Sequence, residues 1–255
     1  MNGFKRLAEK LLDTANKAAD GLVFTPAELH QELIHYADII SKHIAYFTEL
    51  TALETERFLE RTYHFRKTKT FHYTGLEASD EVEILISACA VQITFGLRKY
   101  KMPFFKDIYV LADQYHLGPN QQDWVGHVNR DGIYLSWKHF LLGYDVNNDR
   151  YNVGLHEMAH ALEYVNFLGF FGRTHEFPEE FMLYKRQVEL TFAEDQRDLF
   201  SEQGKSNYHE AWAEGVELFF ENPQELNQYY PNLYRLIKQL LNQDPLNKIK
   251  ILKPQ

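Results

Sequence analysis

The stretch Asn152-Val153-Gly154-Leu155-His156-Glu157-Met158-Ala159-His160-Ala161-Leu162-Glu163 contains the pattern His-Glu-x-x-His within a run of helix-forming residues. In an α-helix, His156 and His160 lie one turn apart on the same face, so both imidazoles can reach one cation. Glu157 lies beside them, where its carboxylate can accept a proton from a water on that cation without binding the cation itself. The pattern therefore predicts a catalytic zinc site.

The residues around this pattern favour a packed helix. Asn152 is a suitable N-cap, and an apolar face for the core is formed by Val153, Leu155, Met158, Ala159 and Leu162. The alternative is a purely structural helix, with two partly buried histidines and Glu157 paired to a surface base. Because a five-residue pattern also arises by chance, the rest of the chain must decide between the two.

A catalytic zinc ion usually takes three protein ligands and keeps a fourth position open, so a third ligand must come from elsewhere. The metzincin spacing would need glycine and histidine where the chain has Glu163 and Asn166. A later segment, 207–220, offers carboxylates at i, i+4 and i+7 on one helical face: Glu210, Glu214 and Glu217. One of them can bind zinc while another orients a histidine, although such a face is also typical of a solvated helix.

Several separate segments, in the same order, resemble the Mlc titration factor A family of zinc-dependent peptidases. The resemblance runs from about residue 50 to about residue 245 and rests on Arg57–Arg61, 84–97, Gly132–Trp137, Asn152–Glu163 and 204–220. Motifs in a shared order are more specific than the zinc pattern alone. The resemblance implies that Glu210 is the third zinc ligand beside His156 and His160, and that Glu157 is the catalytic base.

One position departs from the family. The family carries a tyrosine seven residues before the third ligand, proposed to steady the oxyanion of the tetrahedral intermediate, and this chain has Gln203 there. An amide N–H can donate a hydrogen bond in its place, and Tyr208 is a second candidate for the same task. Loss of one oxyanion donor costs roughly a hundredfold to a thousandfold in turnover. The departure therefore predicts a slower peptidase or a shifted substrate preference.

The fold is predicted to be α+β, mainly helical, with a small mixed sheet next to the His-Glu-x-x-His helix. Helical patterns cover 4–19, 26–65 and 80–96, and the extended segments are 71–73, 108–111 and 133–137. An edge strand is expected to pair with an extended substrate, and the segment 133–137 lies just before the zinc helix. The resemblance implies a zincin-like catalytic domain similar in outline to that of anthrax lethal factor.

Residues 1–50 are predicted to form an N-terminal helical appendage and residues 51–255 the catalytic domain, together one compact unit. The net charge of −9 and the pI near 5.7 argue against direct nucleic-acid binding. No apolar run of about 18 residues exists and the N-terminus lacks a signal-peptide core, so we expect no membrane span and a cytoplasmic location. The single cysteine, Cys89, excludes an intramolecular disulfide and is expected to be a small buried hydrophobe.

The sequence therefore predicts a peptidase with one zinc ion per chain, acting on peptide or protein substrates as an aminopeptidase or an endopeptidase. The main alternative is a regulatory binding protein of the same fold that sequesters a partner such as a transcriptional repressor, because the family's namesake binds the repressor Mlc. A third possibility is a metal-dependent hydrolase of non-peptide amides. Glu157 favours catalysis, since a structural metal needs no base, whereas Gln203 favours the binding alternative.

Overall fold

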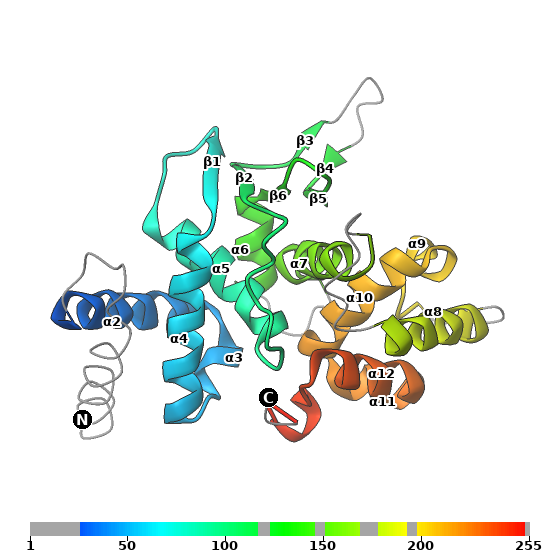
Figure 1. Cartoon of the computed structure of the whole chain (residues 1–255). Coiled ribbons are helices and arrows are strands. Elements are labelled where there is room, and N and C mark those ends of the chain that lie inside the picture. Colours follow the sequence, from blue (N-terminus) through cyan, green and yellow to red (C-terminus); the bar gives the residue numbers. More distant parts are fainter. Residues whose placement is uncertain (1–25, 117–122, 146–150, 169–177, 193–197, 253–255) are drawn as a thin grey trace.

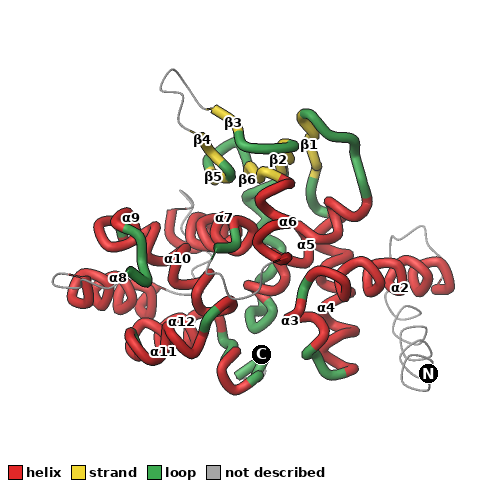
Figure 2. Tube along the Cα trace, turned by 180° about the vertical axis from the view of Figure 1, so that it is seen from behind, coloured by secondary structure: helices red, strands yellow, loops and turns green. Residues whose placement is uncertain are grey.

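The structure is a computed structural model that describes residues 26–116, 123–145, 151–168, 178–192 and 198–252. Helices make up most of these residues, and the strands gather at one end of the molecule, as Figure 1 and Figure 2 both show. The predicted α+β class, mainly helical with a small mixed sheet, is therefore confirmed.

Helices dominate the N-terminal half, as predicted: α2 (Pro26–His43), α3 (Ala45–Thr48), α4 (Ala52–Lys67) and α5 (Asp80–Thr94). The α5 helix begins after Ser79, whose hydroxyl accepts a hydrogen bond from the Glu81 backbone N–H at 3.2 Å. From Ile84 to Thr94 every side of α5 is buried, because α2, α4 and α7 (Val153–Glu163) all pack against it. Cys89 is fully buried there, as predicted.

The predicted division of the chain at residue 50 falls after α3. Residues 1–25 of the predicted appendage lie outside the described residues. Within the described part, Leu33, Tyr36 and Ile40 of α2 are buried in the same hydrophobic core as the residues of α4 and α5. The division of the chain into an appendage and a catalytic domain stays a prediction.

The main sheet has four strands in the order β1 (Thr70–Thr74), β2 (Asp107–Leu111), β6 (Ile133–Ser136) and β5 (Gly126–Val128). The first three are parallel, and β5 is antiparallel to β6. Along β6, Ile133 and Leu135 are buried while Tyr134 between them is only half-buried, so one face of the sheet packs on helices. A separate two-stranded ribbon consists of β3 (Tyr115–His116) and β4 (Asp123–Trp124).

The strand predicted at 133–137 differs from the structure in two respects. It ends at Ser136, whose hydroxyl accepts a bond from the His139 backbone N–H at 3.4 Å at the start of α6 (Trp137–Asp145). It is also an interior strand, flanked by β2 and β5, so it has no free edge for a substrate. The edge strands are β1 and β5, and β5 is the one beside β6; its three residues include a glycine and give almost no strand pattern in the sequence.

The C-terminal half is a helical layer that lies beside α7 in Figure 1. Beyond α7, a π-helical turn η1 (Tyr164–Leu168) is followed by α8 (Pro178–Phe192), α9 (Glu202–Ser206), α10 (Tyr208–Glu221), α11 (Pro223–Tyr229), α12 (Pro231–Leu241) and η2 (Pro245–Asn247). The packed helix predicted at 207–220 is α10, which contacts α7 along much of its length. Among the helices described, none is both long and apolar enough to cross a membrane.

Candidate metal centre

An N-cap and a buried apolar face fix the position of the α7 helix, which carries the two histidines. Its first turn is capped by Asn152, whose side-chain oxygen accepts a bond from the Leu155 backbone N–H at 3.0 Å. Leu155, Met158 and Ala159 are fully buried and anchor the opposite face. The imidazoles of His156 and His160 are therefore left half-buried on the face that turns toward α10.

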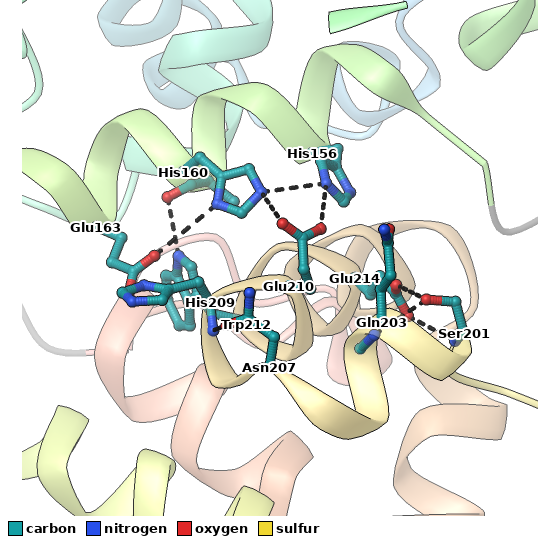
Figure 3. Close-up of polar contacts among 12 residues, drawn as sticks. His156, His160, Glu163, Ser201, Gln203, Asn207, His209, Glu210, Trp212 and Glu214 are labelled. Carbon is teal, nitrogen blue, oxygen red and sulfur yellow. Dashed lines mark hydrogen bonds and ion pairs between the residues drawn. The ribbon is translucent and has the colours of Figure 1, made fainter. Parts of the chain in front are cut away.

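The α10 helix places a carboxylate opposite these imidazoles. Asn207 caps its first turn, and the Trp212 Nε1–H donates to the Ala159 carbonyl of α7 at 2.8 Å, which fixes the two helices side by side. Figure 3 shows the Glu210 carboxylate, in the first turn of α10, pointing at both histidines. Packing between the helices thus brings together residues fifty positions apart in the chain.

The three donor groups converge at the spacing of a small cation site. The Nε2 atoms of His156 and His160 are 3.2 Å apart, and the Glu210 oxygens lie 3.4 Å from His156 Nε2 and 3.6 Å from His160 Nε2. Ligands about 2.0–2.1 Å from a tetrahedral zinc ion are separated by about 3.3 Å from one another. These three side chains therefore fit a zinc ion.

The protonation of the cluster is shaped by its carboxylates. Burial alone would lower the pKa of His160, but the carboxylates of Glu163 and Glu210 raise it to about 9. Burial likewise opposes protonation of His156, while Glu210 and Glu217 raise its pKa well above the ordinary value. The two histidines in turn lower the pKa of Glu210. A divalent cation would replace these protons and satisfy the same charges.

Glu157 lies in the same cleft but binds neither histidine. Its side chain is only 5% exposed, and its Oε2 atom has no hydrogen-bond partner among the described residues. Burial raises the pKa of this carboxyl to about 6. A buried carboxylate oxygen without a partner is costly, and a water or a ligand in the cleft would satisfy it.

Gly126 of the edge strand lies directly against Glu157. A Cβ atom on Gly126 would come within 2.6 Å of both Cγ and Oε1 of Glu157, so only glycine lets β5 approach the carboxylate this closely. Sequence analysis missed this residue, and the signal that could have found it is an isolated glycine in a short apolar and aromatic segment.

Each histidine also has a carboxylate behind it. Glu217 of α10 is 4% exposed, its Oε2 lies 3.1 Å from His156 Nδ1, and its other oxygen accepts from the Asn152 backbone N–H. Glu163, 2% exposed, accepts a short bond of 2.6 Å from His209 Nδ1 and lies 3.9 Å from His160 Nδ1. In the sequence Glu163 serves only to exclude a metzincin site, although its position three residues after His160 places it on the same helical face.

The other predicted site residues lie in different places. Gln203 is exposed on α9, lines the cleft and points toward the cluster in Figure 3. Glu214 accepts bonds from the Ser201 backbone N–H at 2.8 Å and from the Ser201 hydroxyl, which ties α9 to α10. The Tyr208 ring is tilted against the His209 ring, and Lys185 Nζ lies 4.1 Å from the centroid of the Tyr208 ring; Tyr208 is absent from the described residues that line the cleft.

The cleft that holds these groups has a volume of about 860 Å³. Residues 123–128, which include β5, form one wall, α7 contributes the histidines and Glu157, and α9 with the first turns of α10 forms another wall. This size is within the range of about 300–1,000 Å³ that small-molecule and peptide sites occupy. The arrangement can bind a cation, a water molecule and an extended chain side by side.

Comparisons with known proteins show the family of this chain. A family described as glucose-regulated metallo-peptidase M90 matches residues 25–241, a span that contains the whole cluster. The chain is also similar to the uncharacterized protein slr2042 of Synechocystis sp. (strain ATCC 27184 / PCC 6803 / Kazusa), with 22% identity over 83% of this chain and 85% of that protein. The resemblance found in the sequence is thereby confirmed, and the chain belongs to the glucose-regulated metallo-peptidase M90 family, that of Mlc titration factor A.

Proposed function

We propose that this protein is a zinc-dependent peptidase. The observation that carries the proposal is the convergence of His156, His160 and Glu210 in one cleft with Glu157, whose buried carboxylate oxygen has no partner among the described residues. In keeping with the family resemblance, we propose that the sheet, α7 and α10 form a catalytic domain similar in outline to that of anthrax lethal factor.

The roles of the residues follow from their positions. His156, His160 and Glu210 would hold the metal, and Glu157 would take a proton from the attacking water and return it to the leaving amine. A bound zinc ion supplies Lewis acidity, which polarises the scissile carbonyl and lowers the pKa of the water toward neutrality. Glu217 and Glu163 would orient the imidazoles from behind.

Among the described strands, β5 has a neighbour only on the side of β6, and its other edge is suited to an extended substrate. Ser136 N–H donates to the Val125 carbonyl and Asn129 N–H donates to the Gly132 carbonyl, so alternate residues of this segment pair with β6. In an antiparallel pair the residues between them, Gly126 and Val128, turn their N–H and C=O groups to the other side. These groups would bind a substrate backbone beside Glu157, whatever the substrate sequence.

The first experiment is metal analysis of the purified protein combined with assays on chromogenic aminoacyl anilides and short peptides. Close to one zinc per chain with hydrolysis that a chelator stops would support the peptidase. Zinc without hydrolysis of any substrate would instead support the alternative function, a regulatory protein that binds a partner such as a transcriptional repressor. Gln203, at the position of the family's tyrosine, is the observation that favours this alternative.

We expect three of the carboxylates of α10, Glu210, Glu214 and Glu217, to differ in their effect on zinc binding. Glu210→Ala should empty the site, whereas Glu217→Gln should weaken zinc binding about 10-fold to 100-fold, because Glu217 contacts His156 from behind. Glu214→Gln should leave zinc affinity unchanged, since Glu214 is bound to Ser201. Competition with a fluorescent chelator measures all three. Full zinc occupancy in the Glu210→Ala variant, or loss of zinc in the Glu214→Gln variant, would refute the ligand assignment.

Gln203→Tyr should raise kcat with little change in KM, because an added hydrogen-bond donor acts mainly on the oxyanion of the transition state. Tyr208→Phe is the matched control and should leave turnover unchanged, since the Tyr208 ring packs on His209 and Lys185. Steady-state kinetics of both variants show which of the two residues stabilises the oxyanion. A large fall of kcat in the Tyr208→Phe variant would show that Tyr208 holds the oxyanion, and Gln203→Tyr should then add nothing.

Gly126→Ala should lower turnover without removing zinc. The new methyl group would overlap Glu157 and push either the edge strand or the carboxylate aside, and a displacement of about 1 Å can cost roughly a hundredfold in rate. Thermal unfolding, zinc content and kcat measured on one preparation separate this effect from misfolding. A folded, zinc-loaded variant with the parent kcat would mean that β5 does not constrain Glu157.

A further inference from the structure

The cleft carries an excess of negative charge. Seven carboxyl side chains line it, and lysine and arginine are absent from its lining among the residues that the structure describes. A divalent ion would offset two of these charges, and burial lowers the pKa of the His127 imidazole in the same lining. A cleft with charge of one sign raises the local concentration of ligands of the opposite sign.

Most of these carboxylates contact other residues of the protein. Glu163, Glu210 and Glu217 contact histidines, Glu157 lies under β5, and Glu214 is bound to Ser201. Asp198, at the entrance to α9, is exposed and forms no ion pair with any described residue. Asp123 of β4 is also exposed, and its only partner among the described ion pairs is His116 at 3.2 Å. Two carboxylates of the cleft lining are therefore exposed and contact none of the proposed metal ligands.

Two further observations point to a ligand in this acidic cleft and to its charge. The unpartnered Oε2 atom of Glu157, on a side chain 5% exposed, belongs to the cleft lining. The lining also includes aromatic rings: Trp124 is half-buried beside Asp123, and Tyr151 is 47% exposed. Aromatic faces next to carboxylates are the usual surroundings of a bound ammonium or guanidinium group.

We propose that the cleft selects peptides that carry a positive charge near the scissile bond, on a lysine or arginine side chain or on a free amino terminus, with Asp123 and Asp198 as the residues that set this preference. The proposal rests on the proposed peptidase function, because it names the substrate class of the same site. Its chemistry requires only a cationic group beside carboxylates and aromatic rings.

The test uses the zinc-loaded full chain and one short peptide made with lysine, glutamine or glutamate at each position next to the cleaved bond. Each peptide is assayed with a free and with an acetylated amino terminus. We expect kcat/KM to fall in the order lysine, glutamine, glutamate, with roughly tenfold or more between the ends, and the difference to shrink in high salt. A preference for lysine over glutamate that persists in the acetylated peptides belongs to the side chain. A fall of kcat/KM when the same peptide is acetylated belongs to the terminal ammonium.

The double variant Asp123→Asn with Asp198→Asn should reduce the ratio of kcat/KM for lysine over glutamate peptides about threefold to tenfold, mainly through KM. Glu77→Gln is the matched control, because it removes a charge from an exposed residue that is not part of the cleft lining, and its ratio should stay at the parent value. Equal kcat/KM for lysine and glutamate peptides, or a ratio unchanged in the double variant, would overturn the proposal.

The failure of this inference can be told apart from the failure of the proposed function. Binding of the same peptides, labelled with a fluorophore, to the zinc-loaded Glu157→Gln variant is measured by anisotropy. If no peptide is hydrolysed by the parent protein but lysine peptides bind more tightly than glutamate peptides, the cleft selects cations and the peptidase proposal fails. If lysine and glutamate peptides bind equally, the inference fails whether or not hydrolysis occurs.

Discussion

Replacement of Glu157 by glutamine is expected to lower kcat roughly a hundredfold to ten-thousandfold while zinc content and folding stay at the parent level. The amide has nearly the same shape as the carboxyl but cannot accept a proton from the attacking water. Because Glu157 contacts Gly126 of the edge strand, a substitution that keeps its size leaves β5 in place. Metal analysis, circular dichroism and single-turnover kinetics on one preparation measure the three quantities together.

The control for this variant is Glu157→Asp, which keeps the carboxylate but withdraws it by one methylene. We expect partial activity from it, because a base is present but further from the water. Hydrolysis by the Glu157→Gln variant at the parent rate would show that another group accepts the proton and that the assigned mechanism is wrong.

Replacement of His156 or His160 by alanine is expected to have the second large effect, a loss of zinc affinity. Structural zinc in zinc-finger peptides binds with an apparent free energy of about 10–16 kcal/mol, which is about 2.5–4 kcal/mol for each of its four ligands, so the loss of one ligand here should lower the zinc affinity roughly a hundredfold or more. Zinc should be lost during purification, and hydrolysis should be lost with it. Titration of the apoprotein with zinc in the presence of a competing chelator gives the affinity directly.

A histidine outside the cluster provides the comparison. His72 pairs with Asp107 on the sheet, so His72→Ala should keep zinc at the parent level. Full zinc occupancy in both the His156→Ala and the His160→Ala variants would remove the basis of the proposed metal site.

Much of the local structure was predictable because it depends on neighbours in the sequence. The His-Glu-x-x-His pattern predicts its own geometry, since a helix brings positions four apart onto one face. The helix N-caps Asn152 and Ser79 were also predictable from the sequence, because a capping side chain accepts a hydrogen bond from a backbone N–H only two or three residues further on. Strands β2 and β6 followed from their apolar, β-branched runs.

The edge of the sheet was not predictable in the same way. Whether a strand is interior or at an edge depends on which segments pair with it, and β5 is too short for its own residues to decide. The contact between Gly126 and Glu157 likewise joins residues that are far apart in the chain, so no local pattern contains it.

The sequence by itself determined a face of α7 on which two histidines meet and a second helix with three carboxylates on one face. Only the tertiary structure decided what each carboxylate touches. Packing of α10 on α7 turns Glu210 to both imidazoles, Glu217 to the back of His156, and Glu214 away to Ser201. The spacing i, i+4, i+7 makes the three equivalent along an isolated helix, and they become different only when another helix lies against it.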